Sequence, residues 1–166
     1  MTDRPEVPGP YIRPDMKAFI DMMAQVNGPK LADMTLEEAR ASYQALHNLA
    51  DRPARALPVV RDLTCRGPAG DISLRLYDAR ESRDGPTPVI VFYHGGGFVI
   101  GDLDTHHALC TEIAALADLP LVAVHYARAP EAPFPAAILD CEAATRWVAA
   151  GPEALGLTPS GIVTIG

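Results

Sequence analysis

The 166-residue sequence predicts an α/β fold with a mostly parallel central sheet. Short apolar runs, bounded by proline and glycine and rich in β-branched residues, are typical of strands buried on both faces. Three runs have this character: 89–93, 121–126 and 162–165. Helical periodicity between the first two gives a strand–helix–strand unit, which favours parallel strands and a right-handed crossover. Two amphipathic helices precede every strand signal, so a helical N-terminal segment is also expected.

The first of these helices follows a proline-rich arm over residues 1–14 and ends at Gly28-Pro29. Its apolar positions recur at helical spacing: Met16, Phe19, Ile20, Met23 and Val26. The two N-terminal helices can simply plug one end of the core. They can also act as a lid, in which Met16, Phe19, Met22 and Met23 would offer an adaptable apolar surface to a substrate. Periodicity alone does not distinguish the two.

The second helix is predicted after Thr35, which stands three residues before Glu38 in the pattern of a capping box. It ends before Pro53. Its apolar stripe consists of five residues: Leu36, Ala39, Tyr43, Leu46 and Ala50. We therefore divide the chain into an arm with cap helices, residues 1–53, and the first part of an α/β catalytic domain, residues 54–166.

Strands 59–65 and 72–78 are predicted to pair as an antiparallel hairpin, because residues 66–70 carry turn-forming glycine and proline and the second strand alternates apolar with polar residues. The buried strand 89–93 follows. The segment 102–105 supplies capping residues for a helix that continues to Asp118. Pro135 suits the first turn of a further helix through about Ala150.

A glycine loop follows strand 89–93. Residues 95–97 are all glycine, so their backbone can adopt positive φ and their N–H groups can converge on one point. Converging donors just past a buried strand can stabilise the oxyanion formed when an acyl carbonyl is attacked. A flexible hinge is the alternative, but polar residues normally flank a hinge, whereas Tyr93 and Phe98 flank this loop. We predict an oxyanion loop, with Phe98 as a substrate contact.

Composition limits the partners. The sequence has 14 Lys and Arg against 21 Asp and Glu, a formal net charge of −7, and no basic patch or tail. This balance argues against nucleic acid and an anionic membrane surface as partners. No secretory signal or transmembrane run is recognised, so a cytoplasmic protein is expected.

Cys65, Cys110 and Cys141 have no metal-ligand spacing and are expected to be buried free thiols. We expect no cofactor and no metal, and interpret His106-His107 as capping or solvent-facing residues.

Four stretches occur together in the pattern of one family. They are His94-Gly95-Gly96-Gly97-Phe98, Gly101 followed by Thr105-His106, Tyr126 with Ala129-Pro130-Glu131, and Pro133-Phe134-Pro135-Ala136. With them the chain resembles the hormone-sensitive-lipase-like family of α/β-hydrolases, the bacterial type IV esterases. The resemblance implies that the N–H groups of Gly96 and Gly97 form the oxyanion hole, with Gly95 and His94 supporting the loop, and that the N-terminal helices form part of a cap.

The chain departs from this family at two positions. The family usually reads Asp-Tyr-Arg-Leu-Ala-Pro-Glu where this chain has His125-Tyr126-Ala127-Arg128-Ala129-Pro130-Glu131. Because the Asp and Arg are interpreted as a buried ionic support, their replacement by His125 and Ala127 concerns local packing more than chemistry. His125 invites interpretation as a catalytic base, but its place in a buried strand favours a satisfied core histidine.

In the family, the strand ending at Gly166 leads into the nucleophile elbow Gly-x-Ser-x-Gly. The resemblance therefore implies that the Ser, Asp and His of a triad lie beyond Gly166. None of the four serines has an elbow around it: Ser42, Ser73, Ser82 and Ser160. We expect a second polypeptide or a continuation of the chain to supply the C-terminal half.

The leading hypothesis is a serine carboxylesterase for short- to medium-chain acyl esters, in which this chain contributes the oxyanion loop and part of the cap. Two alternatives remain open: a non-catalytic small-molecule-binding protein of the same fold, and a fragment that is inactive when isolated. A small-molecule acyl ester is the expected partner, and assembly into a homo-oligomer is left open.

Overall fold

A computed structural model describes residues 9, 11–25 and 28–166. Its contacts divide the chain into two compact units, Met1–Met34 and Thr35–Gly166. The first unit contains helix α1 (Pro14–Gln25) and a short 3-10 helix, η1 (Leu31–Asp33). The predicted first helix is confirmed up to Gln25; its last apolar position, Val26, and most of the predicted arm lie outside the described residues. Within the described residues, no helix is long and apolar enough to cross a membrane.

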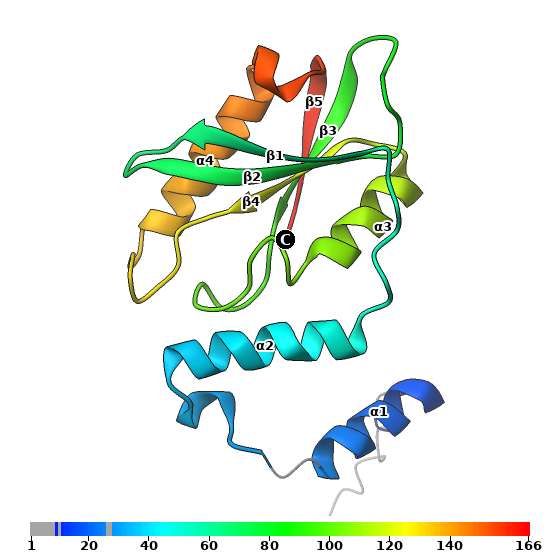
Figure 1. Ribbon diagram of the computed structural model, residues 1–166, viewed down its shortest axis with the longest axis vertical. Helices are drawn as coiled ribbons and strands as arrows, with labels where there is room; N and C mark the ends of the chain where they lie inside the picture. The colour runs from blue at the N-terminus through cyan, green and yellow to red at the C-terminus, as the bar shows by residue number, and fades with distance from the viewer. Residues whose placement is uncertain (1–8, 10, 26–27) are drawn as a thin grey trace, which may run out of the picture. The chain divides into compact units, whose positions relative to one another are not determined.

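The second unit is built on a five-stranded mixed sheet with the order β1-β2-β4-β3-β5 (Figure 1). The strands are β1 (Val59–Arg66), β2 (Asp71–Asp78), β3 (Thr87–Tyr93), β4 (Leu121–His125) and β5 (Pro159–Ile165). β3 pairs in parallel with β4 and β5, while β1 and β2 form the predicted antiparallel hairpin and β2 pairs antiparallel with β4. The predicted parallel strands and hairpin are therefore confirmed, and β3 lies inside the sheet.

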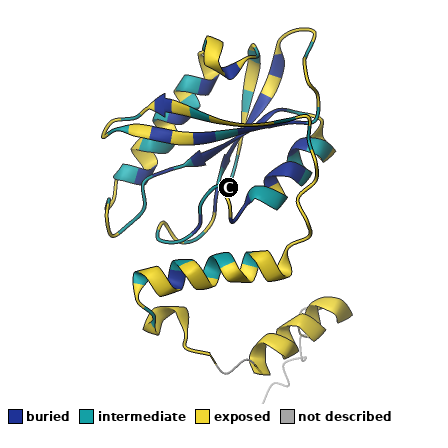
Figure 2. Cartoon of the chain, viewed as in Figure 1, coloured by how far each residue is buried: buried dark blue, intermediate teal, exposed yellow. Residues whose placement is uncertain are grey.

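Helices α3 (His107–Ala117) and α4 (Ala136–Ala149) cover opposite faces of this sheet (Figure 1). Successive side chains of a strand point to opposite faces. Accordingly, Val89 and Val91 of β3 pack in the cluster that includes α4, whereas Ile90 and Phe92 pack in the cluster that includes α3. β3 and β4 are buried along most of their length (Figure 2), as expected for strands covered on both sides.

The expectation that β5 is buried is wrong in this structure. Its residues are exposed or half-buried, and Val163 keeps 45% of its surface exposed. The reason is its position: β5 lies at one edge of the sheet and pairs with β3 alone among the described strands. Apolar sequence identified the strand, but burial depends on neighbours that a local pattern does not reveal.

Helix α2 (Leu36–Ala50) begins at the predicted capping box: the Thr35 side chain accepts from the Glu38 backbone N–H, and the Glu38 carboxylate accepts from the Thr35 backbone N–H. The predicted apolar stripe is only partly correct. Ala39 is buried, but Leu46 and Ala50 are exposed. The face that packs consists instead of Ala39, Arg40, Tyr43 and His47. Arginine and histidine on this face account for the error, because a search for apolar spacing passes over them.

Candidate active site

The glycine loop leaves β3 with a backbone that only glycine readily adopts. φ is 122° at Gly96, 61° at Gly97 and 87° at Gly101. A Cβ at Gly96 would stand 2.1 Å from the Ile100 carbonyl oxygen, and one at Gly101 would stand 2.4 Å from the Gly95 carbonyl oxygen. Since both clashes are with backbone atoms, the turn excludes any side chain at these two positions.

In this turn the Gly96 carbonyl is hydrogen-bonded, whereas the N–H groups of Gly96 and Gly97 are not, among the described residues. The Gly96 carbonyl accepts from the N–H groups of Val99 and Ile100, both at 3.1 Å. By contrast, the N–H groups of Gly96 and Gly97 donate to no acceptor within the described part of the chain. Unbonded backbone donors in a fixed turn are available to an anion.

The glycine turn lines a pocket of about 350 Å³. Its wall is mostly apolar and includes Phe98, Tyr126, Ala137, Ile138 and Cys141. The predicted contact Phe98 is thus at this pocket, whereas Phe19 and Met23 lie on α1, in the other unit, and their substrate role stays a prediction. The three α4 residues were not predicted. Helical periodicity after Pro135 indicated the helix, but not which of its faces meets the loop.

His94, at the start of the loop, is buried and held by three contacts. Its ring stacks on Tyr126, with centroids 4.2 Å apart and planes 13° from parallel. Its Nδ1 lies 2.9 Å from the Gly95 carbonyl oxygen, so Nδ1 carries the proton and donates. The Tyr126 hydroxyl donates to the His94 carbonyl oxygen. Burial lowers the pKa of His94 to about 4, which keeps the ring neutral at pH 7. The supporting role of His94 remains a prediction, and these contacts favour it.

Two further histidines surround His94. His106 is buried, with its ring centroid 5.6 Å from that of His94 and 5.4 Å from that of His47 on α2. The expectation that His106 caps a helix or faces solvent is therefore wrong: it occupies the N-cap position of α3 without a side-chain cap bond. Burial lowers the pKa of His106. The rings of His47, His106 and His94, which are tilted relative to one another, connect α2 to the glycine loop.

His125 ends β4, with its ring centroid 6.2 Å from that of His94. Its Nδ1 is buried and has no partner among the described residues, so the description as a satisfied histidine is wrong. Burial, followed by the nearby Arg128 charge, lowers the pKa of His125. Within the described chain no carboxylate bonds to its ring, so the orienting group that a general base needs is missing from its surroundings.

The cysteines are free thiols. Cys65 and Cys110 are buried and Cys141 is half-buried at the loop pocket. Burial raises the pKa of all three, to about 12 for Cys110 and about 11 for Cys141. They are therefore protonated at pH 7 and are poor nucleophiles.

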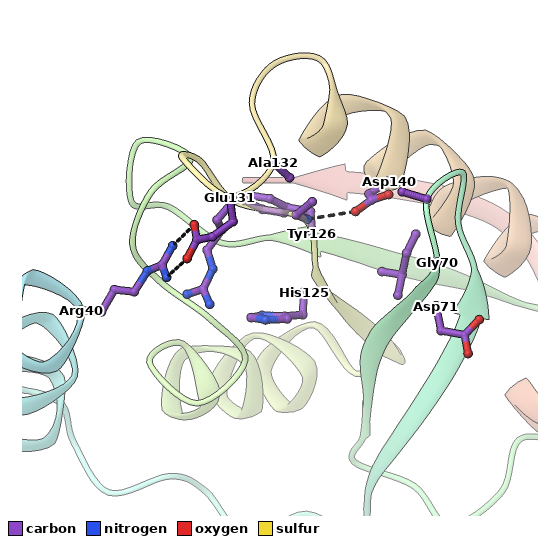
Figure 3. Close-up of a pocket in the computed structure, with 12 residues that line it drawn as sticks. Arg40, Gly70, Asp71, His125, Tyr126, Glu131, Ala132 and Asp140 are labelled. Carbon is purple, nitrogen blue, oxygen red and sulfur yellow. Dashed lines mark hydrogen bonds and ion pairs between the residues drawn. The ribbon is translucent and has the colours of Figure 1, made fainter. Parts of the chain in front are cut away.

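A second pocket, of about 390 Å³, lies beside the loop that follows β4 (Figure 3). Charged and polar side chains line it: Arg40, Asp71, His125, Arg128, Glu131 and Asp140. Figure 3 shows Arg40 of α2 facing the Glu131 carboxylate, with two bonds at 2.5 and 2.9 Å. Sequence reasoning did not identify Arg40, because an arginine among the residues of an amphipathic helix is usually solvent-facing.

Residues 90–166 match the family described as the alpha/beta hydrolase fold. The chain is 48% identical over 110 residues to Esterase LipI of Mycobacterium tuberculosis, covering 66% of this chain and 34% of that protein. It is 38% identical over 165 residues to Carboxylesterase NlhH of the same species, covering 98% of this chain and 49% of that protein. Among solved structures, a hyperthermophilic esterase from the archaeon Pyrobaculum calidifontis superposes with a TM-score of 0.80 at 32% identity, over 92% of this chain and 48% of that one.

With its sheet, its crossover helices and its sequence matches, the chain has the α/β-hydrolase fold that the sequence indicated, and it is similar to esterases of that fold. It spans between a third and a half of the length of these three relatives.

Proposed function

We propose that the intact protein is a carboxylic ester hydrolase of the hormone-sensitive-lipase-like branch, in which this chain supplies the oxyanion hole. The observation that carries the proposal is the glycine turn: at the edge of an apolar pocket, Gly96 and Gly97 present N–H groups that have no acceptor among the residues the structure describes. The names of the relatives, esterase and carboxylesterase, support ester hydrolysis.

In the proposed reaction a serine hydroxyl attacks the ester carbonyl carbon and transfers its proton to a histidine. The carbonyl oxygen becomes an oxyanion, which accepts hydrogen bonds from the N–H groups of Gly96 and Gly97. Collapse of this intermediate breaks the bond to the alcohol, which leaves with the proton, and water then hydrolyses the acyl-enzyme. The turn is held by close backbone packing around Gly96 and Gly101 and by its own hydrogen bonds, so little reorganisation accompanies formation of the charge.

The nucleophile and its partners would lie outside this chain. No serine is among the described residues that line the loop pocket, and the aligned segments cover only 34% of LipI and 49% of NlhH. The pocket volume of about 350 Å³ and its apolar wall support acyl groups of short to medium length.

The experiment is hydrolysis of p-nitrophenyl esters from acetate to octanoate by the intact protein. We expect turnover well above the buffer rate, with kcat/KM highest for the shorter chains. The matched variants are G96A, which meets a backbone oxygen at 2.1 Å, and G70A, whose Cβ would meet nothing within 4 Å. Turnover no faster than buffer would refute the proposed activity, and full turnover in G96A would refute the assigned loop.

A further inference from the structure

Arg40 connects helix α2 to two loops that are far from it in sequence. Its Nε donates to the Val99 carbonyl at 3.0 Å, in the segment that closes the glycine turn. Its Nη2 donates to the Ala129 carbonyl at 3.3 Å, and both terminal nitrogens bond to the Glu131 carboxylate. One planar guanidinium therefore uses all three of its nitrogens at once, which is the fork geometry that lysine lacks.

The bonded atoms belong to a closed set of contacts around the glycine turn. Val99 donates its own N–H to the Gly96 carbonyl. The carbonyl just before Val99, that of Phe98, accepts from the N–H of Ala129 at 2.8 Å. Arg40 then bonds to the carbonyls of both Val99 and Ala129. The orientation of the Gly96 and Gly97 peptides is thus coupled, through one residue, to α2.

Helix α2 is a firm support for this side chain. Its first turn is closed by the Thr35–Glu38 capping box, and its buried Ala39 precedes Arg40 directly. Farther along, the rings of Tyr43 and His47 lie against the buried His106. The Arg40 side chain is 24% exposed, and its bonds to the Val99 and Ala129 carbonyls are partly shielded from water, whereas its bonds to the more exposed Glu131 are open to solvent.

We propose that Arg40 is a positioning residue for the oxyanion loop, which acts through the Val99 and Ala129 carbonyls and is itself oriented by Glu131. The inference rests on the proposed ester hydrolysis for its catalytic consequence, but not for its structural one. For α2 alone, it also decides between the two roles that periodicity left open: the contacts make this helix a fixed support of the site and not a freely moving lid.

The test compares R40M with R55M in the intact protein. Arg55 forms an equivalent two-bond pair with Glu112, both at 2.9 Å, away from the loop. We expect R40M to lower kcat for an aryl ester about tenfold or more with KM changed less than threefold, because a small misplacement of oxyanion donors acts on the transition state. R55M should keep wild-type kcat. R40K should recover only part of the loss.

Amide hydrogen exchange gives a readout that does not depend on activity. Val99 and Ile100 donate to Gly96, so their amides report on the turn. Exchange at these two amides should accelerate at least tenfold in R40M and stay unchanged in R55M. Wild-type kcat and exchange in R40M would overturn the proposal, as would equal losses in R55M.

If R40M does not fold, E131Q carries the test, since it keeps the arginine and removes its charged partner. We then expect a several-fold loss of kcat and faster exchange at Val99, and wild-type values would overturn the proposal. If the wild-type protein hydrolyses no ester, the proposed function fails, whereas exchange in these variants still decides for or against Arg40.

Discussion

The turn of the β1–β2 hairpin and the loop after β3 both contain glycines, but they differ in how their backbone donors are used. In the β1–β2 hairpin, the Gly67 N–H donates to the Gly70 carbonyl at 2.7 Å, so the turn satisfies itself. In the loop after β3, the Gly96 carbonyl accepts two hydrogen bonds, from the N–H groups of Val99 and Ile100. The Gly96 N–H itself has no acceptor among the described residues.

The two turns also need glycine for different reasons. A Cβ at Gly67 would meet the Ile72 side chain at 2.6 Å, which a flexible side chain can relieve, and φ there is not positive. At Gly96 the clash is with a backbone carbonyl and φ is 122°. Glycine content alone therefore does not define a binding loop. The features that indicate a binding loop are positive φ angles and backbone N–H groups that lack an acceptor and lie at a pocket.

The largest expected effect breaks the loop itself. G96A forces the Ile100 carbonyl away and misaligns both N–H donors, so kcat should fall on the order of 10²–10³-fold, as for the loss of an oxyanion-hole donor. G70A in the hairpin turn should leave kcat unchanged and should change the free energy of unfolding by no more than about 0.5 kcal/mol. Steady-state kinetics and thermal melts of the two variants measure this difference, and equal kcat values would contradict it.

The next largest effect is the pH dependence of stability that the buried His94 produces. The unfolded chain binds a proton at His94 near pH 6.5, but the folded chain does so only near pH 4. Between these values the unfolded state holds more protons, so stability is complete above pH 6.5 and is lost as pH falls toward 4, by about 3 kcal/mol at most from this residue. Urea unfolding across this range should show a steeper loss in wild type than in H94N.

An NMR titration of the His94 ring checks the same point directly. Its resonances should stay those of a neutral imidazole down to about pH 5. Titration near pH 6.5, or equal pH slopes for wild type and H94N, would show that the ring is not held in the way described.

A smaller effect is expected from Tyr126, a residue outside the glycine loop that supports it. Y126F removes the hydroxyl that donates to the His94 carbonyl but keeps the stacked ring. We expect a loss of about 1 kcal/mol in stability and up to about tenfold in kcat. Y77F removes a hydroxyl of the same kind, 3.1 Å from His107 Nδ1, and should show the stability loss without the loss of kcat. Identical kcat values in both variants would remove Tyr126 from the support of the loop.

The smallest effect on chemistry is expected at the start of α2. T35A deletes the side-chain half of the capping box and should cost about 1 kcal/mol of stability. Because Arg40 lies more than a turn farther along the helix, kcat should change less than threefold. Chemical denaturation and kinetics of T35A and of S42A, a substitution at an exposed position of the same helix, measure the two quantities. A tenfold loss of kcat in T35A would contradict this expectation and would mean that the capping box also positions the oxyanion loop.

Local sequence predicted the elements and the loop well, because each depends on neighbours in the chain. The Thr35–Glu38 pair located the start of α2, and the glycines after Tyr93 located the turn. Contacts between distant segments were not predictable in this way. The pairing of Arg40 with Glu131 spans 91 residues and carries no local pattern. The row of neighbouring rings formed by His94, His106 and His47 depends equally on how α2 and α3 meet the sheet.

The most direct test of the central claim is the response of the Gly96 and Gly97 amides to a tetrahedral anionic inhibitor, such as an aryl phosphonate, bound to the intact protein. If these N–H groups form the oxyanion hole, their proton resonances should shift downfield on binding, while that of Gly67, already bonded within the hairpin, should not move. Unshifted Gly96 and Gly97 signals with the inhibitor bound would contradict the account.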